Sequence, residues 1–298
     1  MKRIYLLFVL LGLTTLYLVK PAKAGFSLDK IRASIPHHSE WECRFDELHA
    51  GAILSQPFSY LATGAESYVF VSEDDRYVIK FFKMNHLQPK PYLKLLKAIP
   101  SFRAKAERKE KKLANTFKTL ILAYDTFQEE TGLIYLHLNQ TQHLKQKIRL
   151  RDKAGKLYHI SADDYLFTIQ KKADLVYERI GVLLRAGQKA EALDHMQAIL
   201  RLVEKRCQQG LRDQDRGISN NYGFVGTTPV QIDIGRVIQD DRMCDPEETR
   251  QEVERVANKM NAWLRTRLES NVVGGEGQLK EAGGCCVDKL VSHNDVEG

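Results

Sequence analysis

The sequence predicts an α+β protein of two lobes, the first rich in β-strands and the second mainly helical. Strand-like segments divided by short polar turns fill most of the stretch from residue 59 to about residue 140. Two stretches with apolar residues at helical spacing follow residue 173. About 270 residues remain after a predicted leader, which is enough for one two-lobed domain or two small ones.

The N-terminus predicts a signal peptide over residues 1–24. Lys2 and Arg3 precede the apolar run IYLLFVLLGLTTLYLV, and a small-x-small site, Ala22 to Ala24, follows it. This pattern predicts export across a membrane, to the periplasm or outside the cell. The alternative is a single uncleaved N-terminal anchor, although the run is slightly short for a spanning helix. In both cases the positive end stays inside and the remainder lies across the membrane.

The charge of the chain is modest once the leader is set aside. The full sequence carries +7, but four lysine and arginine residues lie in the first 24 positions, where there are no acids. The 41 basic and 38 acidic residues that remain give about +3. This balance argues against a nucleic-acid partner. The basic stretches at 83–118 and 145–156 are interpreted as solvated faces. A membrane contact is expected only through an uncleaved N-terminal segment.

The elements of the first half are predicted as follows. Residues 25–57 are polar with one apolar patch, which predicts a helical preface. Residues 59–83 hold three strand-like segments separated by the turns TGAES and SEDD, which predicts a β-meander. A charged helix is predicted from about Phe102 to Phe117. Further strands are predicted at LILAYDTF (120–127), at LIYLHL (133–138), in a hairpin within KIRLRDKAGKLYHI (147–160), and at DDYLFTIQ (163–170).

The second half is predicted to be mainly helical. Residues 174–207 form two helices that are separated near Gly187. The second helix has one apolar face that we interpret as core; its residues are Leu193, Met196, Ile199, Leu200 and Val203. A third helix is predicted to begin at Asp245-Pro246, with Asp245 as N-cap and Glu248 as the capping-box acid, and to end near Leu268.

The chain is therefore expected to divide into five parts. The last residues contain GGEG and EAGGCC and show no periodicity, which is typical of a disordered tail. The expected parts are a signal peptide (1–24), a preface (25–57), a strand-rich N-lobe (58–140), a reduced helical C-lobe with a β-hairpin insert (141–270), and the tail (271–298).

Two short motifs in the strand-rich half carry the first candidate residues. YLATGAESYVF (60–70) places the small residues Gly64, Ala65 and Ser67 in or beside a turn between strands, where backbone N–H groups can approach an anion. YVIK (77–80) ends the next strand on Lys80.

Two polar loops in the second half carry the other candidate residues. LRDQDRGISNNYG (211–223) holds Asp215 and Asn220 five residues apart, and Asp233 of QIDIGR follows eighteen residues after Asp215. Together and in this order, the motifs resemble the protein-kinase-like superfamily over residues 58–236. The resemblance implies a two-lobed fold with a β-rich N-lobe, a reduced helical C-lobe, and the use of ATP and Mg²⁺.

The resemblance also implies roles for individual residues. Gly64, Ala65, Ser67 and Lys80 would contact the ATP phosphates, and the partner acid of Lys80 would be Glu110, with Glu107 as the alternative. Asp215 would accept or orient the proton of the attacking hydroxyl. Asn220 and Asp233 would supply oxygen ligands to magnesium. Asp213 is a rival of Asp215 for the catalytic role.

The chain departs from the family pattern in ways that leave its activity open. Asp213-Gln214 replace the usual His-Arg, and Ile234 stands where Phe is usual. Only about 60 residues follow Gly235, so the C-terminal part resembles that of small-molecule and atypical kinases. One hypothesis is an active phosphotransferase of undetermined acceptor. The alternative is an exported, inactive pseudokinase that binds a nucleotide or a protein partner. In a third reading, an unrelated α+β fold, Lys80, Asp215 and Asp233 would lie far apart.

Overall fold

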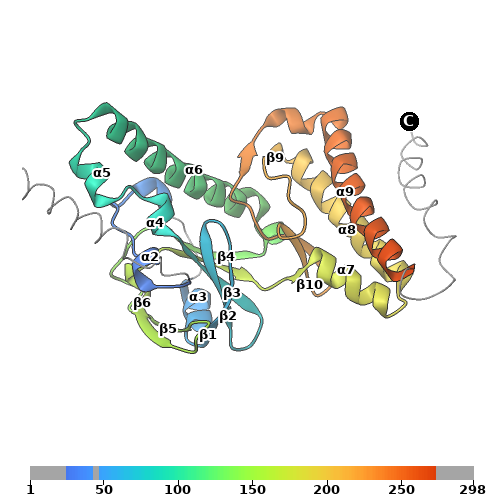
Figure 1. Ribbon diagram of the computed structural model, residues 1–298, viewed down its shortest axis with the longest axis horizontal. Helices are drawn as coiled ribbons and strands as arrows, with labels where there is room; N and C mark the ends of the chain where they lie inside the picture. Colours follow the sequence, from blue (N-terminus) through green and yellow to red (C-terminus); the bar gives the residue numbers. More distant parts are fainter. Residues whose placement is uncertain (1–24, 43–46, 273–298) are drawn as a thin grey trace, which may run out of the picture. The chain divides into compact units, whose positions relative to one another are not determined.

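The computed structural model describes residues 25–42 and 47–272, and the chain forms two compact units (Figure 1). Of the described residues, the first unit holds 25–39, 47–111 and 137–167, and the second holds 40–42, 112–136 and 168–272. The first unit is rich in strands and the second is mainly helical, so the predicted α+β class is confirmed. The predicted signal peptide, and all but two residues of the predicted tail, lie outside the described residues.

A β-sheet forms the centre of the first unit. Within this unit its strands follow the order β3-β2-β1-β5-β6, in which only β1 and β5 are parallel. The predicted meander and the predicted hairpin are both confirmed, and the hairpin turns at Gly155, which has a φ of 84°. The strands are β1 (Pro57–Thr63), β2 (Ser67–Ser72), β3 (Tyr77–Phe82), β5 (Lys147–Arg151) and β6 (Leu157–Ser161).

Short helices surround these strands. The preface contains α2 and α3, so its helical character is confirmed, and aromatic side chains such as Phe58, Phe70 and Phe81 are fully buried on the strands. Edge-to-face packing joins Phe70 to Phe81 at 6.0 Å between ring centroids. The helical segments are α2 (Leu28–Ile31), η1 (Ser39–Trp41), α3 (Glu47–Leu54), α4 (Met84–Leu87), α5 (Pro91–Leu95) and η2 (Ala162–Asp164).

Helix α6 (Pro100–Thr131), which is kinked at Phe127, replaces the predicted strand at 120–127. That prediction is wrong because the apolar residues of this segment continue a helical repeat. The buried side chains are Leu113, Phe117, Leu120, Ala123 and Phe127, spaced three or four residues apart. β-branched and aromatic content indicated a strand locally, but burial of one helical face determined the conformation. The next predicted strand is confirmed as β4 (Leu133–His137), which neighbours β7 (Phe167–Lys171).

Three helices dominate the second unit. The two predicted helices are α7 (Val176–Arg185) and α8 (Lys189–Gln208), and Gly187, with a φ of 76°, lies between them as predicted. Helix α8 packs against both α7 and α9 (Pro246–Val272). The Asp245 side chain accepts hydrogen bonds from the backbone N–H groups of Glu247 (2.9 Å) and Glu248 (3.3 Å), so the predicted N-cap is confirmed.

The predicted capping box is wrong in its second half. The Glu248 carboxylate does not return to the cap; it pairs with the Arg212 guanidinium at 3.0 Å. The Asp245 backbone N–H, which a capping-box acid would accept, instead donates to the Arg242 carbonyl at 3.1 Å. Glu248 therefore pairs with a residue far away in sequence and not with its own helix terminus.

Short strands complete the second unit. β10 pairs with β8 and β11, and β9 pairs with β12, all antiparallel. Within 25–42 and 47–272, none of the helices combines the length and apolar content that a bilayer-spanning segment needs. The remaining elements are β8 (Asp174–Leu175), β9 (Leu211–Asp213), β10 (Tyr222–Val225), β11 (Thr228–Gln231), β12 (Val237–Gln239) and η3 (Asp241–Cys244).

Candidate functional site

Two polar loops of the second unit, 214–221 and 232–236, are held side by side at both of their ends. At one end β9 pairs with β12, with Asp213 opposite Val237. At the other end β10 pairs with β11, with Tyr222 opposite Gln231. The Gln214 N–H also donates to the Arg236 carbonyl at 3.1 Å. The fold therefore brings together the loop that carries Asp215 and Asn220 and the loop that carries Asp233.

Backbone hydrogen bonds join the middle of the two loops. The Asn221 carbonyl accepts from the N–H groups of Ile232 at 2.7 Å and Asp233 at 3.4 Å. One oxygen of each candidate carboxylate shapes its own turn: Asp215 Oδ1 accepts from the Gly217 N–H (2.8 Å), and Asp233 Oδ1 accepts from the Gly235 N–H (3.2 Å). The turns thus set the direction of both carboxyl groups before any ligand arrives.

The two neighbouring asparagines differ sharply in environment. Asn220 is exposed, whereas Asn221 is 4% exposed. In the described part of the chain, Asn221 Nδ2 is buried without a hydrogen-bond partner. A Cβ on Gly217 would lie 3.1 Å from Asp215 Oδ1 and 3.4 Å from Asn221 Oδ1, so the carboxylate and the amide both flank this glycine. Asn221 therefore supports the loop from within, while Asn220 presents its amide to solvent.

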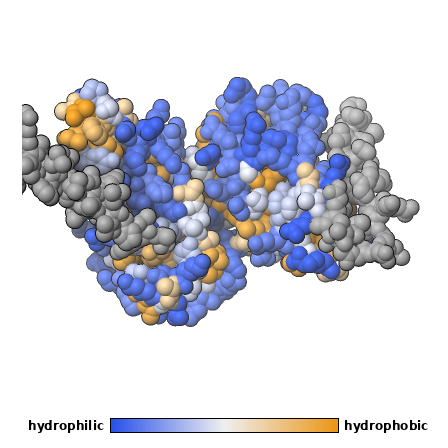
Figure 2. Space-filling model, in the orientation of Figure 1, coloured by the Kyte–Doolittle hydropathy of each residue, from blue (hydrophilic) through white to orange (hydrophobic). Residues whose placement is uncertain are grey.

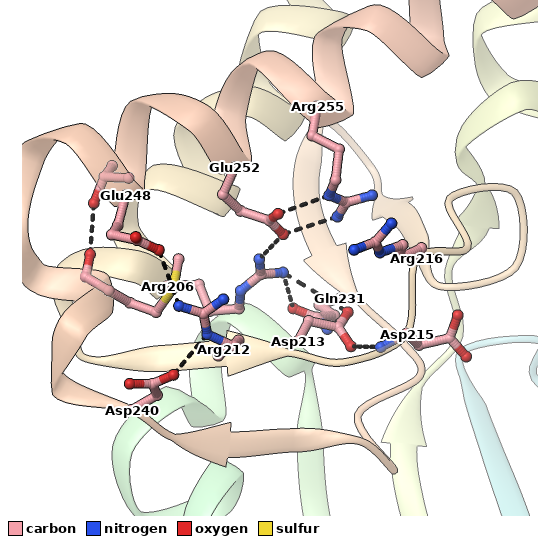
Figure 3. Close-up of polar contacts among 12 residues, drawn as sticks. Arg206, Arg212, Asp213, Asp215, Arg216, Gln231, Asp240, Glu248, Glu252 and Arg255 are labelled. Carbon is pink, nitrogen blue, oxygen red and sulfur yellow. Dashed lines mark hydrogen bonds and ion pairs between the residues drawn. The ribbon is translucent and has the colours of Figure 1, made fainter.

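A fully buried arginine lies behind the loops (Figure 3). Arg206, near the end of α8, donates to Tyr222 Oη at 2.5 Å, Gln231 Oε1 at 3.3 Å and Glu252 Oε1 at 2.7 Å, and its guanidinium lies 3.8 Å from Asp213 Oδ2. Burial raises the pKa of Tyr222 to about 12, which keeps the phenol neutral beside these charges. The network joins α8, α9 and the strands that lead into both loops.

Asp213 belongs to this buried network. Its side chain is 1% exposed, and its two oxygens accept from the Asp215 N–H at 2.8 Å and from Gln231 Nε2 at 2.9 Å. Figure 3 shows the Asp215 carboxylate directed away from this cluster. The geometry makes Asp213 a support for the loop backbone and leaves Asp215 as the carboxylate that a substrate can reach.

A polar pocket of about 320 Å³ lies on the α9 side of the same network. Ion pairs line it: Glu252 holds Arg255 through two contacts of 2.7 and 2.8 Å, and Arg212 pairs with Asp240 at 2.6 Å. The lining residues are Arg212, Asp213, Gln214, Arg216, Met243, Glu248, Gln251, Glu252 and Arg255.

The sequence analysis did not find this network, although one signal was present. Arg206 continues the spacing of Ile199 and Val203, so it falls on the buried face of α8. An arginine on such a face requires buried partners, because an unpaired charge is costly in the interior. The identity of those partners, Glu252 and Gln231 among them, could not be read from spacing.

The candidate phosphate turn lies in the first unit. The Gly64 N–H donates to the Ser67 carbonyl at 2.9 Å, which closes the turn around Ala65. Lys83, which sequence reasoning did not single out, stabilises this turn: its N–H donates to the Glu66 carbonyl and its ammonium donates to the Gly64 carbonyl. Burial lowers the pKa of Lys83, and Lys30 lowers it further.

Lys80 and its proposed acid partners also lie in the first unit. Lys80 is on β3, opposite Val69 of β2, directly after the turn hairpin as predicted. The Glu110 carboxylate forms an ion pair with Lys97 at 3.0 Å, with both side chains close to half exposed, and Glu107 is exposed. The candidate residues are thus divided between the units: the turn and Lys80 in the first, Asp215, Asn220 and Asp233 in the second.

The oxygen donors of the two loops suit a magnesium ion. Asp233 supplies a carboxylate, and Asn220 supplies an exposed amide. Hard oxygen ligands are those that Mg²⁺ prefers, usually one or two carboxylates together with water and phosphate. Across the part of the chain that the structure describes, His, Cys, Asp and Glu do not gather in groups of three or more that would hold a metal alone. A magnesium ion held by these two loops would need further oxygen ligands, such as water or phosphate.

The buried position of Asp213 predicts a pH-dependent contribution to stability. Burial raises the pKa of Asp213 to about 6, although Arg206 acts to lower it. An unfolded aspartate has a pKa of about 3.9, so between about pH 4 and pH 6 the folded chain binds more protons than the unfolded chain. This group therefore lowers the free energy of unfolding as pH rises through that window, by about 3 kcal/mol at most.

We expect Asp213→Asn to remove this slope. Urea unfolding midpoints of both proteins at pH 4, 5, 6 and 7 measure it, and the difference between the two curves cancels the contributions of all other acids. Parallel curves across this range would show that folding does not raise the pKa of Asp213.

Comparisons with known proteins found limited likeness. No family model matches the chain, and no curated protein matches it. Among solved structures, the medium-resolution structure of the bifunctional kinase-methyltransferase WbdD is 15% identical over 58% of this chain, with a TM-score of 0.29. A co-crystal structure of WbdD with a kinase inhibitor is 18% identical over 67% of this chain, with a TM-score of 0.31. The matched regions span 30% and 37% of those chains. The likeness is loose, so the site rests on its own geometry.

Proposed function

We propose that this protein is a phosphotransferase that uses ATP and Mg²⁺, with an acceptor that is not yet identified. The observation that carries the proposal is the pairing of the two loops. Two carboxylates eighteen residues apart in sequence lie on adjacent turns, and a fully buried arginine network holds the strands behind them. Solvated turns do not need such support, whereas phosphoryl transfer depends mainly on positioning and on charge stabilisation.

Asp215 is the group that would accept the proton of the acceptor hydroxyl. Its side chain is partly exposed, its Oδ1 is oriented by Gly217, and its backbone N–H is held by Asp213. A general base needs this combination of access and fixed direction, since proton transfer requires a hydrogen bond of about 2.6–3.2 Å to the hydroxyl. Asp213 is the positioning residue, because it acts on Asp215 through the backbone.

Asp233 and Asn220 are the residues that would hold Mg²⁺. A bound metal would neutralise charge that develops on the transferred phosphoryl group. Asn221 keeps the two loops at a fixed separation through its carbonyl. In the first unit, the turn that holds Gly64, Ala65 and Ser67, together with the side chain of Lys80, supplies the candidate phosphate contacts. The proposal for Glu110 as the partner of Lys80 requires that the carboxylate leave Lys97.

A thermal-shift experiment on the purified full chain tests nucleotide binding. ATP with Mg²⁺ at about one hundred times its dissociation constant stabilises a protein by about 2.7 kcal/mol, which corresponds to a rise in Tm of roughly 5–10 °C for a chain of this size. We expect this rise with ATP and Mg²⁺ together, and little of it when EDTA removes the metal. We expect Asp233→Asn to lose the metal-dependent part.

Asp194→Asn is the matched control for this change. Asp194 is an exposed aspartate on α8, outside both loops, and its replacement should leave the shift intact. The absence of any shift at millimolar ATP would contradict the proposal. A shift that Asp233→Asn retains would place the metal elsewhere.

A further inference from the structure

An exposed apolar surface lies where α5 meets the start of α6, in the first unit. Leu95 is 84% exposed, Tyr92 is 51% exposed and Ile99 is 45% exposed. We call these three residues the α5–α6 corner. The Tyr92 ring lies edge-on to Phe102 of α6, at 6.5 Å between centroids, so the corner has a defined conformation. Figure 2 shows apolar colour gathered at this end of the unit. Large apolar side chains that cluster in water usually mark an interaction site.

The segment that carries the corner is rich in positive charge. Between residues 90 and 111 the sequence contains eight lysine and arginine residues and only two glutamates, a net charge of +6. Two of these side chains are anchored locally: Lys97 pairs with Glu110, and Arg103 Nε donates to the Lys97 carbonyl at 3.0 Å. Lys105 lies 5.9 Å from the centroid of the Phe102 ring, beside the corner. We call the eight lysine and arginine residues of this segment the basic collar.

We propose that the α5–α6 corner binds the surface of an anionic lipid bilayer. Such a surface offers negative headgroups and an apolar interior within about 5–10 Å of each other. The two parts of this surface match that arrangement, because Leu95, Ile99 and Tyr92 can enter the acyl boundary while the lysines remain at the headgroups. This contact is separate from the N-terminal apolar run, and it does not depend on the proposed phosphotransferase activity.

A bilayer fits these observations better than the other negatively charged partners. A nucleic acid would satisfy the charges but would leave Leu95 and Ile99 in water, and the whole chain lacks the charge excess of such proteins. An acidic protein would have to match both the collar and the apolar residues. The experiment below distinguishes this case.

Leu95→Ser/Ile99→Ser tests the proposal by vesicle co-sedimentation of the full chain. Vesicles of phosphatidylcholine alone are compared with vesicles that contain phosphatidylglycerol as well. We expect wild-type binding to be at least tenfold stronger on the anionic vesicles, to weaken in high salt, and to fall about tenfold in the double variant. Both substituted residues are exposed, so the Tm should not change.

Leu48→Ser is the matched control. Leu48 is 89% exposed on the short helix α3, and residues 47–75 contain no lysine or arginine. Its replacement should leave vesicle binding unchanged. The proposal would be overturned if Leu48→Ser lost as much vesicle binding as the double variant, or if the double variant bound vesicles as well as the wild type. Binding that salt abolishes but the double variant retains would point to charge alone, as for an acidic protein, and would also overturn it.

If the N-terminal apolar run binds the chain to every vesicle, co-sedimentation no longer reports on the corner. A fluorescence measurement then tests the corner directly. Tyr92→Trp adds an indole at the corner. We expect an additional blue shift of emission on anionic vesicles, relative to the wild type, because the ring enters an apolar environment. The absence of that shift would overturn insertion of the corner, whatever the amount of protein bound.

Discussion

Asp215→Asn is expected to lower the rate of ATP turnover by about 10²–10⁴-fold, with little change in the affinity for ATP and Mg²⁺. General acid–base groups contribute rate factors of this size. The amide keeps the acceptor that orients Gly217 but cannot accept a proton from the attacking hydroxyl. Release of inorganic phosphate and transfer of phosphate to the protein itself can both be measured without knowing the acceptor.

The comparison with Asp233→Asn separates catalysis from binding. We expect Asp215→Asn to retain the ATP-dependent rise in Tm, whereas Asp233→Asn should lose both that rise and turnover. Asp194→Asn should match the wild type in both assays. Wild-type turnover in Asp215→Asn would remove this residue from the catalytic role. A wild-type chain that binds ATP but shows no turnover with any acceptor tried would favour the inactive binding module.

Arg206→Met is expected to lower the free energy of unfolding by about 3–5 kcal/mol. The Arg206 side chain is fully buried and contacts both Asp213 and Glu252. Removing one member of a buried ionic network leaves charge in the interior without compensation, which costs about this much. For a protein of this size the Tm would fall by roughly 6–20 °C. Urea unfolding at pH 7 with a two-state fit, where the transition permits one, measures the change.

Arg250→Met is the control for this prediction. Arg250 lies on α9 and pairs with Glu247 and Glu254, but its side chain is 55% exposed. Exposed pairs contribute about 0–1 kcal/mol, so the two arginine variants should differ severalfold. Adding Asp213→Asn to Arg206→Met should recover part of the loss, since it removes a buried carboxylate that has lost its cation. Equal effects of the two single variants would show that the network does not carry the stability of this unit.

Local pattern predicted most of the elements but misassigned residues 120–127 and began the strand predicted at 163–170 too early, because η2 ends at Asp164 and β7 begins at Phe167. Alternation and turn residues located β1, β2, β3 and the β5–β6 hairpin, because each of these depends on neighbours a few residues away. Residues 120–127 were predicted as a strand and are helical. Over so short a segment, their apolar residues fit both the period of a strand and the period of a helix. The continuous buried face that runs back to Leu113 shows which period the chain follows.

The residues of the candidate site could be predicted from the sequence, but the buried network that holds their loops could not. The resemblance to the protein-kinase-like superfamily singled out Asp215, Asn220 and Asp233, and the fold places their loops together. The distinction between Asn220 and Asn221 could not be predicted, because adjacent residues in a loop differ only in which side chain the fold encloses. The same holds for the pairing of Glu248 with Arg212 instead of with its own helix terminus.

By itself the sequence determined the α+β class, the order of most elements, and the two loops that carry the candidate carboxylates. These follow from local periodicity, turn chemistry and spacing, which are properties of neighbouring residues. Only the tertiary structure decided that Asp213 is buried and Asp215 accessible, two residues apart in the same polar motif. The reason is that burial is set by Arg206, Gln231 and Glu252, which lie on other elements and become neighbours of this loop only when the chain folds.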